Sequence, residues 1–219
     1  MICAGLGVHS IFTINFDRTL AYINNNDINV ITSCSKPKFV AHASLFRHAT
    51  INNQMNSRIW YLHGDTESPS TIKLGVRSYG IYIRSLNTAF KAYRKYQKKE
   101  SFSAKNYRAW CLSLRNLETS LLNWFWLGIS SPIIFLGCSL PKEEWPLWWF
   151  LHQKSRHLIH YKKHGIENIS YILININSEN YWTSSLRKGI LEAPAGVKIL
   201  PCIGWEDGWN RFINSMKKI

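Results

Sequence analysis

The chain is poor in acidic residues. Of its 219 residues only 13 are Asp or Glu, against 27 Lys and Arg, so the formal net charge is +14. A surface of this sign attracts anions such as nucleotides, nucleic acid or acidic lipid, but it selects none of them. Charged residues make up 18% and hydrophobic residues 46% of the chain, a balance that argues against disorder and favours one packed domain.

Cysteine is also scarce, and its spacing is irregular. The five cysteines lie far apart, so the sequence predicts neither a zinc site nor a disulfide framework. We also find no charged-then-apolar leader and no small-residue cleavage site. These absences predict a cytoplasmic protein with free thiols.

Long uncharged runs are rare too, and one stretch alone, Leu121–Leu140, approaches the length of a membrane span. Gly128, the breaker Ser130-Ser131-Pro132 and the β-branched pair Ile133-Ile134 divide this stretch. We therefore predict a helix end, a turn and a short buried strand there, and no membrane span.

What the sequence does contain is an alternation of short apolar runs and helical patterns. Strands are predicted for Ser10–Asn15, Ile28–Thr32, Arg58–His63, Pro132–Leu136, Tyr171–Asn177 and Val197–Pro201. Helices are predicted for Ser78–Gln97, Tyr107–Leu127, Trp145–Tyr161 and Gly208–Met216. This order predicts a single α/β domain with a Rossmann-like, mostly parallel sheet flanked by helices, because parallel neighbours need helical crossovers.

Polar clusters follow three of the predicted strands, at Asn15, His63 and Gly137. Ligands of such sheets bind beyond the carboxyl ends of the strands. A His side chain exchanges protons near neutral pH, an Asn offers both a donor and an acceptor, and the carboxylate of Asp17 favours developing positive charge. Each residue also has a structural interpretation, because Asn and Asp cap turns and helices and a His before Gly often satisfies a loop.

Three motifs resemble those of sirtuin-like domains and occur in the same order. They are FTINFDRTL at residues 12–20, WYLHGD at 60–65 and IIFLGCSL at 133–140. The nearest resemblance is to the sirtuin-like branch of bacterial antiphage defence. It implies hydrolysis of NAD at the bond between nicotinamide and ribose, and a role in defence by depletion of NAD.

The resemblance also implies a role for each matched residue. The catalytic residues would be Asn15, Asp17 and His63. The residues that bind NAD would be Thr13, Phe16, Gly64, Gly137 and Ser139. No metal is implied, and the four-cysteine zinc module of deacylating sirtuins has no counterpart here, so NAD-dependent deacylation is the lesser alternative.

Members of the family begin with a strand and a Gly-Ala-Gly loop that cradles the pyrophosphate. Only about ten residues precede the first motif, and the glycines Gly5 and Gly7 lead into another strand. We expect the first strand and the phosphate loop to be missing, or to be supplied by a second copy or by a partner chain. Weak or absent NAD hydrolysis by this chain alone is the consequence.

A rival interpretation is a basic module without catalysis that binds nucleic acid or a protein partner. Its surfaces would be Lys91–Lys105 and Lys154–Lys163, although such runs are more often solvated helix faces. The nearby Trp145, Trp148 and Trp149 could stack on bases, but their helical spacing favours a buried face.

Overall fold

A computed structural model gives the fold of the chain. It describes residues 10–17, 28–29, 43–46, 48–51, 57–99, 123–131, 133–136, 143–162, 170–174, 197–202 and 204–216. The chain divides into two compact units, the first made of residues 1–102 and 108–127 and the second of residues 103–107 and 128–219. The single domain stays a prediction.

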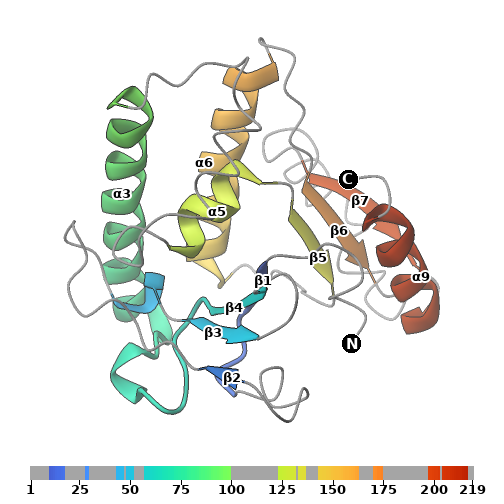
Figure 1. Cartoon of the computed structure of the whole chain (residues 1–219), viewed down its shortest axis with the longest axis horizontal. Coiled ribbons are helices and arrows are strands. Elements are labelled where there is room, and N and C mark those ends of the chain that lie inside the picture. The colour runs from blue at the N-terminus through green and yellow to red at the C-terminus, as the bar shows by residue number, and fades with distance from the viewer. Residues whose placement is uncertain are drawn as a thin grey trace. The chain divides into compact units, whose positions relative to one another are not determined.

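The first unit contains a mixed sheet of four strands (Figure 1). The strands are β1 (Ser10–Thr13), β2 (Ile28–Asn29), β3 (His48–Ile51) and β4 (Ser57–Tyr61), and a 3-10 helix η1 (Ala43–Phe46) precedes β3. Their order is β1-β4-β3-β2. The pair β1 and β4 is parallel, whereas β3 runs antiparallel to both β4 and β2.

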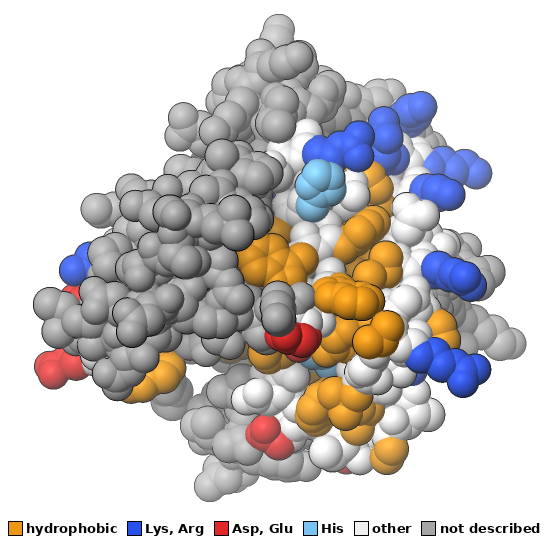
Figure 2. Space-filling model, turned by 180° about the vertical axis from the view of Figure 1, so that it is seen from behind, with side chains coloured by type: hydrophobic (Ala, Val, Ile, Leu, Met, Phe, Trp, Pro, Cys, Tyr) orange, Lys and Arg blue, Asp and Glu red, His pale blue; other side chains and the backbone are white. Residues whose placement is uncertain are grey.

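Helix α3 (Gly75–Lys99) is the longest helix among the described residues, and a short 3-10 helix η2 (Pro69–Thr71) precedes it. Its apolar residues recur at helical spacing, so that one face is buried while the other is exposed. Tyr82, Leu86, Ala89 and Tyr93 on the buried face are at most 1% exposed. Figure 2 shows Lys and Arg side chains in a column along the edge that this helix forms.

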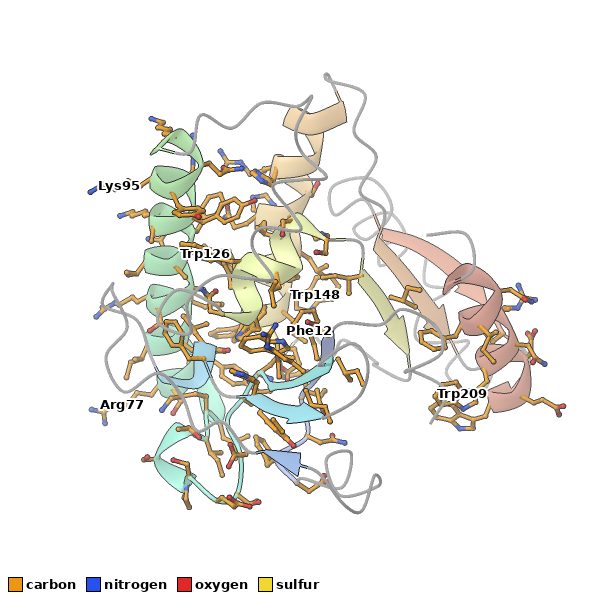
Figure 3. The ribbon with its side chains drawn as sticks, viewed as in Figure 1. Phe12, Arg77, Lys95, Trp126, Trp148 and Trp209 are labelled. Carbon is orange, nitrogen blue, oxygen red and sulfur yellow. The ribbon has the colours of Figure 1, made fainter. Side chains whose placement is uncertain are left out.

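Helix α5 (Trp124–Ser130) is preceded by Asn123, whose side-chain oxygen accepts the Trp126 N–H at 3.0 Å. This is the hydrogen bond of a helix N-cap. Two indole groups then tie the start of α5 to α3. Trp126 donates to the Ala89 carbonyl at 2.9 Å, and Trp124 donates to the Tyr82 hydroxyl at 2.9 Å. Figure 3 shows Trp126 directed at α3.

The second unit holds a wholly parallel sheet in the order β5-β6-β7. Its elements are β5 (Ile133–Leu136), α6 (Trp145–Lys162), β6 (Ser170–Ile174), β7 (Val197–Pro201) and α9 (Gly204–Met216). Helix α9 packs on β5 and β6 (Figure 1). The predicted strand is confirmed as β5. The helix predicted for Tyr107–Leu127 is wrong at its end, because α5 starts at Trp124 and continues through Gly128 to Ser130. Among the described helices, none has the apolar length that a membrane span requires.

Two expectations for α6 are wrong. Lys154 is not part of a surface patch, because it is fully buried and its ammonium donates to the carbonyls of Gly128 (2.7 Å) and Ser131 (2.6 Å) at the end of α5. A cation there complements the helix dipole. Trp145 is 46% exposed, because Leu147, Phe150 and Leu151 form the buried face and Trp145 lies on the opposite side of the helix.

Candidate functional site

The carboxyl ends of β1 and β4 lie side by side. The parallel register pairs Thr13 with Tyr61, and the Leu62 N–H extends the ladder by donating to the Thr13 carbonyl at 3.0 Å. Asn15 lies two residues after Thr13, and His63 lies two residues after Tyr61. The parallel pairing therefore brings the two strand ends next to each other, whereas the catalytic roles of the two side chains stay predictions.

The segment after β1 presents polar groups to solvent. Asn15 and Asp17 are exposed, and Phe16 between them is partly buried. The Asn15 N–H donates to the Thr13 hydroxyl at 3.1 Å, and Thr13 itself is only 7% exposed. Thr13 thus shapes the turn that displays the Asn15 amide, which gives it a structural task beside its predicted contact with NAD.

His63 lies in an aromatic surround and is only 2% exposed. Its ring stacks on that of Tyr79, with centroids 5.5 Å apart and planes 21° apart. Tyr82 meets it edge-on at 6.2 Å, and Phe16 lies at 6.5 Å. Two of these rings come from α3 and one from the segment after β1, so that α3 and the turn after β1 together hold the imidazole.

Gly64 follows His63 with a backbone angle φ of +87°, a conformation that favours glycine. A Cβ atom at this position would lie 2.4 Å from the backbone carbon and oxygen of Thr71. The close approach fixes the course of the chain directly after His63. Packing therefore requires this glycine, whatever part it has in binding NAD.

Asp65 organises the loop that follows and was not singled out by sequence reasoning. Its carboxylate is buried and accepts the N–H groups of Glu67 (3.0 Å) and Ser68 (3.2 Å). The sequence offered a signal for this role, because an Asp in a loop often accepts hydrogen bonds from the backbone N–H groups two and three residues after it, as in an Asx turn.

Two backbone hydrogen bonds join this loop to the site. The Thr66 N–H donates to the Phe16 carbonyl at 3.1 Å, and the Lys73 N–H donates to the His63 carbonyl at 2.9 Å. Partial burial lowers the pKa of the Lys73 ammonium, because desolvation disfavours its charged form. The loop from residue 64 to residue 73 is thereby fixed to both strand ends.

A hydrogen-bond chain also fixes the end of β4 to α3 and α5. The Tyr82 hydroxyl donates to the carbonyl of Leu62 and accepts the indole N–H of Trp124. Tyr79 and Tyr82 were missed as site residues. The apolar pattern of residues 78–97 predicted a helix there but gave no information on which strand end the helix would meet.

Gly137 and Ser139, the remaining predicted NAD contacts, lie outside the described residues. Among the residues that the structure describes, no group of three His, Cys, Asp or Glu side chains is arranged to hold a metal ion. No protein-family model matches the chain, and neither curated proteins nor solved structures include a significant match to it. The site must therefore be interpreted from its own chemistry and from the three motifs.

Proposed function

We propose that the chain is a sirtuin-like NAD hydrolase domain, in which water replaces nicotinamide at the anomeric carbon of the ribose. The observation that carries the proposal is the pairing of β1 with β4, which brings Asn15 and His63 to matching positions beyond two neighbouring parallel strands. Carboxyl ends of parallel strands are where such sheets bind ligands.

The residues at these strand ends suit the reaction. The bond to nicotinamide breaks through a transition state with positive charge on the sugar, which an ionised Asp17 stabilises electrostatically. The exposed amide of Asn15 orients the nicotinamide or the attacking water. His63 accepts a proton from a ribose hydroxyl or from that water, and the reaction releases nicotinamide, ADP-ribose and a proton.

Burial of His63 adds a condition to this proposal. Because the imidazole is 2% exposed, the sugar reaches it only if a neighbouring group, such as the partly buried Phe16 ring, moves aside. The apolar surround then excludes water from the reacting bond. The same proposal includes a cytoplasmic location, assembly with a second copy or a partner chain, and NAD depletion during phage infection.

The decisive variant is Asn15→Ala, because Asn15 is exposed and its side chain can be shortened without disturbing the core. Nicotinamide release from NAD is measured by chromatography on the full chain. We expect a loss of about 100-fold or more, in the range typical of a positioned catalytic group. Asn87→Ala, at an exposed asparagine of α3, is the matched control and should retain full activity.

Calorimetric titration with NAD completes the test. Release of nicotinamide by the unaltered chain, lost in Asn15→Ala and in His63→Ala but not in Asn87→Ala, supports the proposal. Equal release by all four proteins refutes the assigned site. If the unaltered chain neither binds NAD nor releases nicotinamide, NAD hydrolysis is refuted as its activity. NAD binding with weak release agrees with a site that a second chain completes.

A further inference from the structure

Helix α3 carries seven cations and no acidic residue over its 25 residues. The structure describes the side chains of six of them, and all six are exposed. They are Arg77, Arg84, Lys91, Arg94, Lys95 and Lys98. Within the described ranges, no carboxylate forms an ion pair with any of the six.

The cations gather on one side of the helix. Four of them recur at intervals of seven residues: Arg77, Arg84, Lys91 and Lys98. Seven residues make two helical turns to within about 20°, so these side chains lie nearly above one another. Lys95 falls within the same arc of about 60°. The buried residues of α3 lie on the opposite side, and Figure 3 shows Arg77 and Lys95, near the two ends of the helix, both pointing away from the rest of the unit.

This arrangement differs from an ordinary solvated helix face. Such faces commonly alternate Glu or Asp with Lys or Arg at spacings of three and four, where opposite charges stabilise the helix. Here Lys91 and Lys95, and likewise Arg94 and Lys98, are like-charged neighbours four residues apart. The repulsion between them is relieved when a polyanion lies along the helix.

We propose that the exposed face of α3 binds the phosphate backbone of double-stranded nucleic acid. From Arg77 to Lys98 the cations extend over about 31 Å at 1.5 Å per residue. That length corresponds to roughly nine base pairs at 3.4 Å per step. Contacts of this kind position a duplex without selecting its sequence, so the binding is independent of sequence.

An acidic membrane fits this face less well. A helix that binds a membrane surface inserts its apolar face between the lipids, but the apolar face of α3 is already buried against the protein. Among its described residues the large apolar side chains that are exposed, Val76 and Ile81, lie in its first two turns. The cation-rich remainder of α3 offers charge without an apolar anchor.

Fluorescence anisotropy of a labelled 20-base-pair DNA duplex of mixed sequence, titrated with the full chain at several salt concentrations, tests the proposal. Six phosphate contacts predict a slope of about −5 for log affinity against log salt, and an affinity loss of about 10³-fold between 50 and 200 mM salt. In Arg84→Gln/Lys91→Gln, with two contacts removed, the slope should fall to about −4.

The matched control is Arg156→Gln/Arg211→Gln, which removes the same charge from exposed positions on α6 and α9. It should leave the slope at its original value. If the slope of log affinity against log salt falls equally in both double variants, net charge alone drives binding and the proposal is overturned. No binding to the duplex, with binding to phosphatidylserine vesicles instead, would overturn it as well. The proposal is independent of NAD hydrolysis.

Discussion

Replacement of Gly64 by Ala should destabilise the first unit for two separable reasons. The residue has φ of +87°, and an L-residue in the left-handed region costs about 1–2 kcal/mol. The added Cβ would also lie 2.4 Å from the backbone carbon and oxygen of Thr71. Relief requires a shift of Thr71, and overpacking of this kind costs about 1–3 kcal/mol. The expected sum is about 2–5 kcal/mol.

Two other glycines of the same unit separate these contributions. Gly75 has φ of +77° with nothing within 4 Å of an added Cβ, so Gly75→Ala should cost the conformational part alone, about 1–2 kcal/mol. Gly80 lies inside α3 with ordinary φ and open space around it. Gly80→Ala should therefore stabilise the protein by up to about 1 kcal/mol, because glycine is a poor helix former.

Urea unfolding followed by tryptophan fluorescence measures all three free energies of unfolding, with a common slope. From most to least stable, the expected order is Gly80→Ala, the unaltered chain, Gly75→Ala and Gly64→Ala. A Gly64→Ala protein as stable as Gly75→Ala would refute the close approach of residue 64 to Thr71, and with it the described course of the chain after His63.

Three further variants test individual contacts. Lys154→Met removes the buried ammonium that donates to the carbonyls of Gly128 and Ser131 at the end of α5. Loss of these hydrogen bonds should lower the free energy of unfolding by about 1–3 kcal/mol, measured by thermal denaturation. Tyr82→Phe removes the hydroxyl between the Trp124 indole and the Leu62 carbonyl, with an expected loss of about 1–3 kcal/mol in urea. Arg211→Gln breaks an exposed ion pair with Asp207 and should leave the urea midpoint unchanged within error. An unchanged midpoint in either buried variant, or a shifted one in Arg211→Gln, would contradict the respective contact.

Strands and helices with strong local patterns could be predicted from the sequence. Residues 197–201 form β7 as predicted, and α3 extends the predicted helix by a few residues at each end. In contrast, β3 was missed, because a four-residue strand with His and Thr among its residues has no apolar run to reveal it. Its antiparallel pairing with β4 depends on contacts between distant residues, which periodicity does not report.

The same contrast between local patterns and distant contacts applies to the residues of the candidate site. Asn15 and His63 could be proposed because each stands at the end of an apolar run, and the end of a run is a local signal. Tyr79 could not be found, because its contact with His63 joins a helix to a strand end through tertiary packing. Lys154 was misjudged for a similar reason. A run of cations predicts an exposed surface, but the ammonium of Lys154 donates to a carbonyl of another helix, which the local sequence does not reveal.

Helix α3 takes part in both proposals, through opposite faces. Tyr79 and Tyr82 hold His63 from the buried side, whereas Arg84 and Lys91 lie on the exposed side, with Arg84 about 160° around the helix from Tyr82. Neutralising those two cations therefore leaves the surround of the imidazole intact. Shortening Asn15 likewise leaves every cation of α3 in place. Because neither set of substitutions touches the other face, loss of nicotinamide release and loss of duplex binding are independent results.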